Sequence, residues 1–396
     1  MKILVILSRV PYPLEKGDKL RAYHQIRELN KRHQIILCCL ADEPVHKDSE
    51  KVLSEITDKF YIFKLQKWRI LLNLFFCFFS RKPFQVMYFY QRPIHRAIGK
   101  ILHAETPDHI YCQLVRTAEY AKSEHNFSKT IDYQDAFSKG MDRREQKARW
   151  PFREIIAMER RRLIGYENII FEYFEHKTII SVEDRRFIYH PERNDIAVIS
   201  NGIDTDFFSP THPAEKQTDL VFIGNMSYPP NIETAEYIVH YILPLLQQQK
   251  PGIKLTLAGS SPHKRVRQLA NTDGVEVLGW VDDIRDAYAS ARVFIAPMQI
   301  GTGLQNKLLE AMAMEIPCVT SSLANRSLRA RKNSEILVGD TPDEYAAHIL
   351  KLLNDPSLRA ELGKAGKAFV SANYSWEHSV RQLEKVMRAQ NGDVSV

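Results

Sequence analysis

The segment with the most specific chemistry spans residues 300–314 and reads IGTGLQNKLLEAMAM. It follows an apolar run at Val293–Ala296 and opens a helical pattern, which predicts a position at the edge where open α/β sheets bind ligands. Gly301 and Gly303 let the backbone approach a ligand, and the free amides of a helix start suit a diphosphate. Lys307 adds positive charge, so the segment predicts a site for a phosphorylated ligand.

The same segment carries a carboxylate. Glu310 lies one helical turn beyond Asn306 on the same face, where it can accept hydrogen bonds from two sugar hydroxyls. The alternative is an ordinary helix in which Lys307 and Glu310 pair on the surface and the glycines form a plain turn. Under the ligand interpretation, the candidate contacts are Gly301, Thr302, Gly303, Leu304, Gln305, Asn306, Lys307 and Glu310.

Two further sets of polar residues follow apolar runs in the first half. In the loop at 8–21, Gly17 gives close approach, and the charges of Lys19 and Arg21 can neutralise a leaving diphosphate. The alternative for this loop is a solvated basic helix start. Arg116 follows a second run, and Asp132 and Asp135 follow a third, where they orient substrate hydroxyls or cap the next helix.

Positive charge is concentrated in the first half of the chain. Residues 1–195 hold 35 Lys and Arg against 26 Asp and Glu, whereas residues 196–396 hold 20 against 22. Residues 59–104 contain nine basic side chains and no acidic one. This distribution predicts a negatively charged partner.

A mostly apolar stretch, Ile70–Phe79, lies inside this basic region. It is too short to span a bilayer but suited to an anionic membrane interface, and the alternative is a core helix with solvated ends. No nucleic-acid motif accompanies the charge, so we favour the membrane over nucleic acid. A second basic stretch, Arg143–Arg162 with Trp150, is expected to widen this face, and it lies in a charged stretch, Arg143–Glu175, that is expected to be helical. The candidate membrane contacts are Trp68, Arg69, Phe75, Phe76, Arg81 and Lys82.

Strand-length apolar runs alternate with helical segments throughout the chain, which predicts parallel sheets covered on both faces. Two series of runs predict two Rossmann-like domains with a boundary in the polar stretch Pro191–Asp195. The first series is Ile3–Leu7, Ile35–Leu40, Phe60–Phe63, His109–Leu114, Thr130–Tyr133 and Thr178–Val182. The second is Leu220–Gly224, Lys254–Ala258, Val275–Leu278, Val293–Ala296, Cys318–Ser321 and Ile336–Val338. Helical patterns at Pro342–Leu353, Ser357–Val370 and Trp376–Met387 follow.

Several classes of protein are excluded. The five cysteines form no CxxC and mostly sit in apolar runs, which is typical of reduced core thiols in the cytosol. The first apolar run is too short for a signal peptide, and no run reaches the roughly 18 residues of a membrane span. HExxH, HxH, GxSxG and GxxxxGK[ST] are absent, so we expect no metal site, hydrolase elbow or P-loop.

Residues 300–314 resemble the nucleotide-sugar site of retaining GT-B glycosyltransferases of family four, and more narrowly that of exopolysaccharide-associated sugar transferases. Further segments match in order and spacing: Asn201–Asp204 with Phe208–Pro210, Phe222–Asn231, Gly279–Asp283 and Tyr374–Trp376. The second of these contributes Gly224, Asn225 and Asn231 to the expected donor contacts.

Two departures from the family pattern stand in the donor half. Thr302 occupies the position of the first of two family glutamates, and the loop Gly224–Ser227 lacks the usual Arg and Lys. Lys307 and a basic residue of the first domain are the expected substitutes. Arg116 stands near the place where most members hold a His.

The resemblance implies an acceptor-side domain at 1–195, a donor domain at 196–374 and a helix at 375–396 that returns to the first domain, with a cleft between the domains. It implies transfer of a sugar, with retention, from a nucleotide diphosphate sugar to a glycan or lipid-linked acceptor. The setting would be bacterial exopolysaccharide or capsule synthesis, at the inner face of the cytoplasmic membrane.

Catalysis in such an enzyme rests on charge stabilisation of the departing diphosphate and needs no metal or other cofactor. No pair of carboxylates can be assigned from the sequence as nucleophile and acid. A nucleotide-sugar 2-epimerase and a non-catalytic nucleotide-sugar-binding module are the alternatives.

Overall fold

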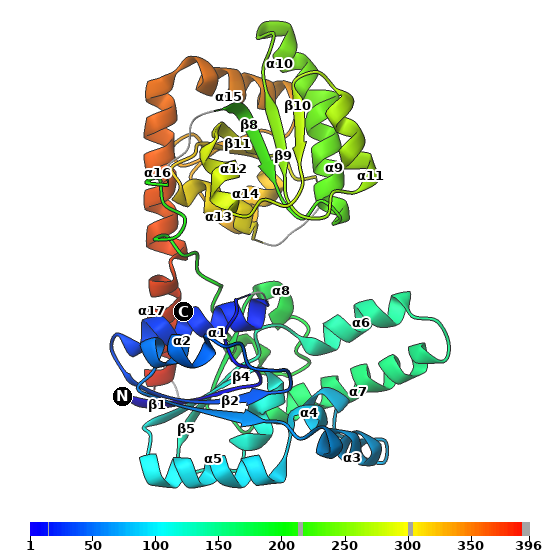
Figure 1. The fold of residues 1–396 in the computed structure, drawn as a ribbon, viewed down its shortest axis with the longest axis vertical. Coiled ribbons are helices and arrows are strands. Elements are labelled where there is room, and N and C mark those ends of the chain that lie inside the picture. Colours follow the sequence, from blue (N-terminus) through cyan, green and yellow to red (C-terminus); the bar gives the residue numbers. More distant parts are fainter. Residues whose placement is uncertain (15, 213–216, 300–303, 390–396) are drawn as a thin grey trace. The chain divides into compact units, whose positions relative to one another are not determined.

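The computed structural model describes residues 1–14, 16–212, 217–299 and 304–389. The chain divides into two units, the first formed by Met1–Asn201 with Trp376–Val396 and the second by Gly202–Ser375. Figure 1 shows the helices and strands of each unit. No helix within the described residues is long and apolar enough to cross a membrane.

The first unit contains a seven-stranded parallel sheet with the order β3-β2-β1-β4-β5-β6-β7. Alternate residues of β1 enter opposite cores: Leu4 and Ile6 pack on one face, and Ile3, Val5 and Leu7 on the other. A parallel sheet covered on both faces needs apolar residues at every position, which explains the continuous apolar runs. The strands are β1 Lys2–Leu7, β2 Gln34–Ala41, β3 Lys59–Lys64, β4 His109–Gln113, β5 Ser128–Asp132, β6 His176–Ile179 and β7 Ala197–Val198.

Helices cover both faces of this sheet. Helices α1, α2 and α17 contribute to one core, while α3, α4, α5 and α7 contribute to the other. The helices are α1 Gly17–Asn30, α2 Ser49–Ile56, α3 Lys67–Cys77, α4 Phe84–Phe89, α5 Arg92–Glu105, α6 Phe137–Lys147, α7 Phe152–Phe171, α8 Val182–Arg185 and α17 Trp376–Arg388. Short 3₁₀ helices lie at Val115–Tyr120 and Arg193–Asp195.

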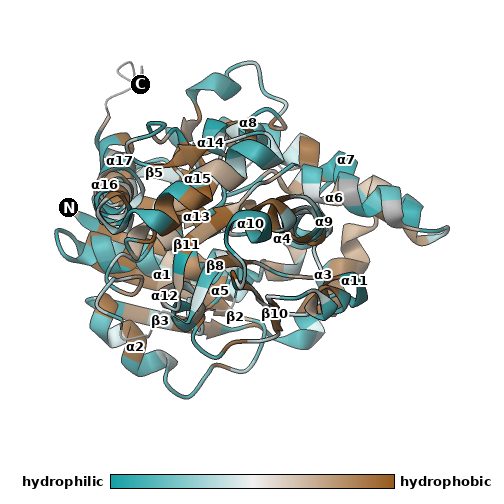
Figure 2. Ribbon diagram, turned by 90° about the horizontal axis from the view of Figure 1, so that it is seen from above, coloured by the Kyte–Doolittle hydropathy of each residue, from teal (hydrophilic) through white to brown (hydrophobic). Residues whose placement is uncertain are grey.

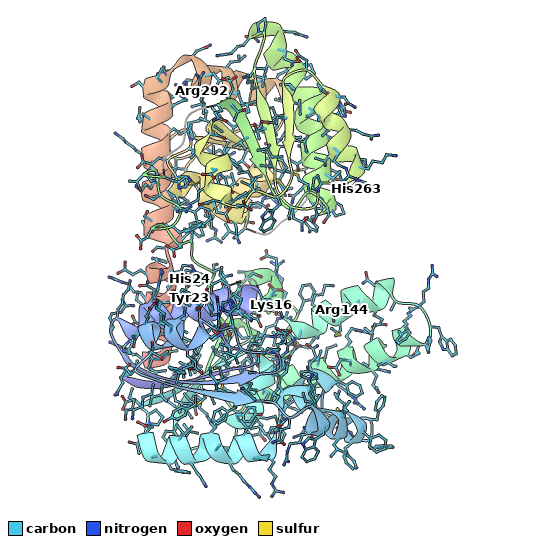
Figure 3. All side chains as sticks on the ribbon, viewed as in Figure 1. Lys16, Tyr23, His24, Arg144, His263 and Arg292 are labelled. Carbon is cyan, nitrogen blue, oxygen red and sulfur yellow. The ribbon has the colours of Figure 1, made fainter. Side chains whose placement is uncertain are left out.

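The C-terminal helix α17 belongs to the first unit, as expected. Val380, Leu383 and Met387 pack into the core beside α1, and the Trp376 ring stacks on His24 of α1 with centroids 4.9 Å apart. Figure 3 shows Tyr23 and His24 on the α1 side of this contact. The apolar spacing of α17 therefore matches a real packing face.

The second unit contains a six-stranded parallel sheet with the order β10-β9-β8-β11-β12-β13 around one continuous core. Its strands are β8 Thr218–Ile223, β9 Leu255–Ala258, β10 Val275–Leu278, β11 Ala291–Ala296, β12 Cys318–Thr320 and β13 Leu337–Val338. Its helices are α9 Pro229–Tyr237, α10 Leu243–Gln249, α11 Lys264–Gln268, α12 Ile284–Ala289, α13 Asn306–Ala313, α14 Ser322–Leu328, α15 Pro342–Asn354 and α16 Pro356–Tyr374. A π-helix at Ile238–Ile242 and a 3₁₀ helix at Leu269–Asn271 complete the unit.

Three sequence-based boundaries need correction. The first unit ends after Asn201 rather than at residue 195, because the short strand β7 pairs with β6. Val182 begins α8 instead of ending a strand, and the Ser181 hydroxyl caps that helix by accepting from the Asp184 amide. The helical stretch at 143–175 is divided into α6 and α7, with a break at Trp150-Pro151.

Candidate functional site

Helix α13 positions the predicted donor contacts of the second unit. Leu308, Leu309 and Met312 are buried in the core, which turns Lys307 and Glu310 towards the opposite side of the helix. Asn306 is exposed at the helix start, and Leu304 packs partly against the core. The Gln305 side chain does not cap the helix. The expected contacts Gly301, Thr302 and Gly303 lie outside the described residues.

Lys307 lies in a small polar cluster with residues of the β8–α9 connection. Its Nζ donates to Oδ1 of Asn231 at 2.6 Å and lies 4.7 Å from the centre of the Phe222 ring. Burial lowers the pKa of Lys307 to about 8, against the opposing effect of Glu310. The structure thus places Lys307 beside the loop Gly224–Ser227, which lacks the Arg and Lys expected there from the family pattern.

Gly224 and Asn225 complete this cluster. Asn231 Nδ2 donates to the Asn225 carbonyl oxygen at 2.9 Å. A Cβ on Gly224 would lie 2.7 Å from Asn231 Nδ2 and 3.2 Å from Lys307 Nζ, so any side chain there would displace the amide. Gly224, Asn225, Asn231 and Lys307, all predicted from the sequence, therefore lie together.

Glu310 has a partner that the sequence analysis missed. The Tyr288 hydroxyl donates to Oε2 of Glu310 at 2.6 Å and to the Lys307 carbonyl oxygen at 3.3 Å. Tyr288 is fully buried in α12, and burial raises the pKa of Glu310 although Tyr288 and Lys307 oppose this rise. Tyr288 stands five residues after the Gly279–Asp283 motif, but nothing in its spacing identifies this contact.

Arg21 corrects one prediction. It is fully buried, with Nε donating to Asp132 Oδ2 at 2.7 Å and Nη1 donating to Asn201 Oδ1 at 2.8 Å. The Tyr111 hydroxyl also donates to Asp132 Oδ2 at 2.9 Å. Because both charged groups are completely buried and paired, neither Arg21 as a diphosphate contact nor Asp132 as an orienting group for substrate hydroxyls fits the structure.

Gly17 and Lys19, the other two candidates from the loop at 8–21, are accessible to a ligand. Gly17 is exposed at the first position of α1, and a Cβ there would meet no atom within 4 Å, so the fold itself does not require a glycine. Lys19 is half-buried two residues later. Figure 3 marks Lys16, which directly precedes this helix start.

Arg116 and Arg9 gather on one aromatic ring at the carboxyl edge of the first sheet. The Arg116 guanidinium lies 5.1 Å from the Phe89 ring centre, and that of Arg9 lies 5.9 Å from the same centre. Arg9 donates to Asp18 Oδ2 at 2.8 Å, and Arg116 donates to Gln85 Oε1 at 2.8 Å. The sequence analysis selected Arg116 but not Arg9, because only the fold brings the ends of β1 and β4 together.

The two guanidinium groups have unused hydrogen-bonding capacity. Their Nε atoms are buried without a hydrogen-bond partner in the part of the chain that the structure describes. Burial lowers the pKa of Arg116 to about 10, and the charge of Arg9 adds to this effect. Asp135 lies nearby, and desolvation of its carboxylate together with the charge of Asp184 raises its pKa to about 6. This set can bind an anionic or hydroxyl-bearing ligand.

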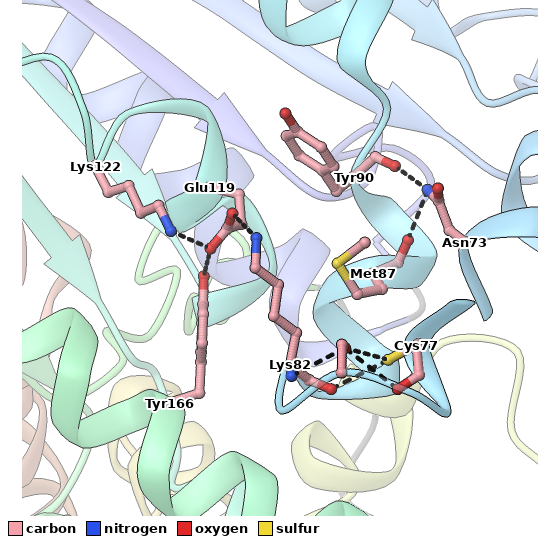
Figure 4. A network of polar contacts seen from close by, with 9 residues as sticks. Asn73, Cys77, Lys82, Met87, Tyr90, Glu119, Lys122 and Tyr166 are labelled. Carbon is pink, nitrogen blue, oxygen red and sulfur yellow. Dashed lines mark hydrogen bonds and ion pairs between the residues drawn. The ribbon is translucent and has the colours of Figure 1, made fainter. Parts of the chain in front are cut away.

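The predicted membrane contacts lie on and after α3. Trp68, Phe75 and Phe76 are each more than half exposed, and the Arg69 guanidinium lies 4.4 Å from the centre of the Trp68 ring. Arg81 is exposed. Lys82 differs from these residues: its Nζ binds Glu119 Oε2 at 2.7 Å, which links the loop after α3 to the core, while its side chain stays 42% exposed (Figure 4).

Comparisons with known proteins identify the second unit. Residues 217–355 match the family described as "Glycosyl transferases group 1". The second unit is therefore similar to glycosyltransferase group 1 domains over these residues. This match covers β8 through α15 and therefore includes Asn231, Lys307 and Glu310.

Two relatives extend the similarity of this chain beyond residues 217–355. An uncharacterised 44.6 kDa protein in the cps region of Klebsiella pneumoniae is 21% identical over 94% of this chain and 96% of its own length. A GDP-mannose-dependent monoacylated α-(1-6)-phosphatidylinositol monomannoside mannosyltransferase of Corynebacterium glutamicum is 24% identical over 58% of this chain and 64% of its own length.

Solved structures identify the fold. HepE of Anabaena in complex with UDP is 14% identical, covers 98% of this chain and 99% of its own, and gives a TM-score of 0.60. A glycosyltransferase from Rickettsia africae is 12% identical, covers 98% of both chains and gives the same TM-score. The expected GT-B fold class, with two parallel-sheet units of Rossmann type, is confirmed.

Proposed function

We propose that this glycosyltransferase transfers a sugar, with retention, from a nucleotide diphosphate sugar to a hydroxyl of a glycan or lipid-linked acceptor. The observation that carries the proposal is the cluster at the start of α13, where the Lys307 ammonium lies beside Asn231 and Gly224. An ammonium and unpaired helix amides are the groups that bind a diphosphate.

The donor roles follow from this cluster. Lys307 neutralises the diphosphate. Gly224 has no side chain, so Asn231 and Lys307 can lie close to its backbone, and the carbonyl oxygen of Asn225 accepts a hydrogen bond from Asn231. Glu310, oriented by Tyr288, accepts hydrogen bonds from the ribose hydroxyls. Similarity to a structure solved with UDP supports a nucleotide donor. The expected contacts at 301–306 complete this proposed site.

In the reaction, the bond between the anomeric carbon of the sugar and the diphosphate oxygen breaks. The acceptor oxygen bonds to that carbon and passes its proton to the departing diphosphate oxygen, so that the nucleoside diphosphate leaves with the electron pair of the broken bond. We assign Gly17, Lys19, Arg116 and Asp135 as the contribution of the first unit, with Arg9 as an addition. Positive charge stabilises the departing diphosphate, so the proposed mechanism uses no metal or other cofactor.

The biological setting is also a proposal. A relative in a cps region supports surface polysaccharide synthesis, and a relative named for a phosphatidylinositol monomannoside supports a lipid-linked acceptor. A cytoplasmic protein that binds the inner face of the membrane through α3 would meet such an acceptor. The exposed side chains of α3 support this location.

The test is a panel of nucleotide sugars incubated with the protein, with and without lipid-linked and free glycan acceptors. Acceptor-dependent release of nucleoside diphosphate, with an α-linked product from an α-linked donor, is the expected result. Nucleotide release without an acceptor and with a rearranged sugar would instead indicate an epimerase. Tight donor binding without turnover across the panel would indicate a binding module.

A further inference from the structure

Helix α3 presents an apolar face that the first unit leaves uncovered. Ile70 and Cys77 are buried, and Asn73 Nδ2 donates to the carbonyl oxygens of Met87 and Tyr90 at 3.2 and 2.5 Å, which fixes the orientation of the helix (Figure 4). Seven large apolar side chains on and just after α3 are 47–82% exposed: Trp68, Leu71, Leu72, Phe75, Phe76, Phe78 and Phe79. An apolar cluster of this size is characteristic of a binding surface.

A second exposed apolar cluster lies at the turn between α6 and α7, residues 148–155. Trp150 is 82% exposed, Phe152 is 68% exposed and Ile155 is 42% exposed. Fully buried contacts of α7 begin only at Glu159, so the first turns of this helix extend beyond the core. In Figure 1 the paired helices α6 and α7 project from the unit on the side where α3 lies, and Figure 2 shows them on that side again.

Arg162 connects α7 to the carboxyl end of α3. Its Nη1 donates to the Cys77 carbonyl oxygen at 2.9 Å, and its Nη2 donates to that of Phe78 at 3.1 Å. The same guanidinium lies 5.0 Å from the centre of the Phe84 ring. One side chain of α7, the helix that begins at the turn, therefore binds the carboxyl end of α3.

Glu159 strengthens this connection. Its two carboxylate oxygens accept hydrogen bonds from the amides of Phe84 and Gln85, at 2.7 and 3.0 Å. These amides belong to the first turn of α4, where unpaired donors attract a carboxylate. The contact holds α7 to α4, and α4 follows α3 in the chain.

The charge around both clusters selects the partner. Lys67 and Arg81 are exposed beside α3, and Arg149 and Arg153 are exposed at the turn. Arg144 on α6, labelled in Figure 3, adds another exposed basic side chain. Glu154 is the one acidic residue in the stretch 148–155. Aromatic and aliphatic side chains flanked by basic ones complement an anionic bilayer, in which rings enter the interface and cations meet the headgroups.

We propose that α3 and the α6–α7 turn form one two-part surface that binds an anionic lipid bilayer, with Trp150 and Phe152 entering the interface together with the aromatic residues of α3. The proposal extends the membrane location beyond α3 to an element with no role in the proposed donor site. Neither part alone accounts for full binding, because each offers only part of the apolar area and of the charge.

The test is sedimentation of the full chain with vesicles of phosphatidylglycerol mixed with phosphatidylcholine, and with phosphatidylcholine alone. The variant Trp150→Ser/Phe152→Ser should bind the anionic vesicles at least about tenfold more weakly than the unmodified protein, because it loses two interfacial rings. The matched control is Trp280→Ser, which removes a tryptophan that is 77% exposed in the second unit and should leave vesicle binding unchanged. Unchanged circular dichroism and an unchanged urea-unfolding midpoint in both variants verify that they fold.

A second measurement locates the ring directly. In the variant Trp68→Phe/Trp280→Phe, the remaining tryptophans are Trp150 and the buried Trp376. Brominated lipid should quench the exposed component of the fluorescence, which comes from Trp150. Undiminished vesicle binding by the turn variant, or absence of quenching, would overturn the proposal. So would self-association of the protein that the turn substitutions abolish, because a second copy would then cover this surface.

Discussion

The Nζ atom of Lys307 donates to Oδ1 of Asn231 at 2.6 Å, and this hydrogen bond joins the first turn of α13 to the first turn of α9. The two residues are far apart in the sequence and follow different strands, β11 and β8, which are neighbours in the sheet. The carboxyl ends of neighbouring parallel strands bring their following loops together. In the proposed donor site, Lys307 supplies the charge and Asn231 holds it in place.

The lowered pKa of Lys307 predicts a pH dependence of nucleotide binding. Burial brings this pKa to about 8, so the ammonium loses its proton as the pH rises through that value. Affinity for a nucleoside diphosphate should therefore fall above about pH 8, by at most about tenfold per pH unit. Calorimetric titration across this range measures the slope. Lys307→Met should bind weakly at every pH, and a flat wild-type profile would contradict the role of Lys307.

The same shift has a separate effect on the free energy of unfolding. Because the pKa of Lys307 is lower in the folded protein than its ordinary value of 10.5, the unfolded chain holds the proton more tightly. Burying the charged Lys307 ammonium lowers the free energy of unfolding. This loss is present in full below about pH 8 and disappears as the pH rises to 10.5. Stability of the wild type relative to Lys307→Met should therefore increase across this window.

Glu310 and Tyr288 should act as a coupled pair in nucleotide binding. Glu310→Gln should weaken binding by roughly 1–3 kcal/mol, the effect of disturbing a charge-assisted hydrogen bond. Tyr288→Phe should weaken binding less, because it leaves the carboxylate in place but removes the donor that orients it. The double variant should lose less than the sum of the two single losses. Unchanged affinity in a folded Glu310→Gln variant would exclude Glu310 from the site.

Arg21 is predicted to be a stability residue. Arg21→Met leaves the carboxylate of Asp132 buried without its cation and should lower the free energy of unfolding by about 3–5 kcal/mol. Adding Asp132→Asn should restore part of the loss, since the uncompensated charge is removed. Urea unfolding followed by fluorescence and circular dichroism measures both. Lys19→Ala, two residues away, is the control and should change stability by no more than about 0.5 kcal/mol.

Arg9 and Arg116 are predicted to affect turnover more than nucleotide affinity. Both belong to the first unit, and among the described residues their buried Nε–H groups have no hydrogen-bond partner. Arg9→Ala and Arg116→Ala should each lower kcat by about tenfold or more, since a preorganised positive charge is lost. The exposed Arg92 gives a matched control, because Arg92→Ala removes a surface cation. Full activity in both the Arg9 and the Arg116 variant would show that the charged group of the substrate does not bind at this cluster.

Phe75 and Phe76 of α3 are predicted to affect lipid binding alone. Phe75→Ser/Phe76→Ser should reduce binding to anionic vesicles, because 61% and 63% of these side chains are exposed and available to the interface. Nucleotide affinity should not change, since the proposed donor site belongs to the second unit. High salt should weaken wild-type binding without abolishing it, because the apolar contribution is insensitive to salt. Loss of folding in this variant would show that α3 is a core helix.

The sequence alone determined the architecture and most of the donor candidates. Continuous apolar runs predict buried parallel strands, and their alternation with helical segments predicts two Rossmann-like units, because local periodicity follows from which faces are covered. The spacing of Asn306, Lys307 and Glu310 fixes their shared helix face within a single element. The final helix is likewise evident from its apolar repeat, which matches the residues packed against α1.

Only the tertiary structure decided which charged side chains are unpaired and exposed enough to contact a ligand or a lipid. Lys19 and Arg21 differ by two positions in one helix start, yet Arg21 is fully buried against Asp132 and Asn201, two residues supplied by distant parts of the chain. Lys82 is a basic residue in a basic stretch, but Glu119 engages it. The partners Tyr288 of Glu310 and Arg9 of the Arg116 cluster come from other elements of the same unit. Burial and pairing depend on contacts between segments remote in the sequence, and residue type and local spacing do not encode those contacts.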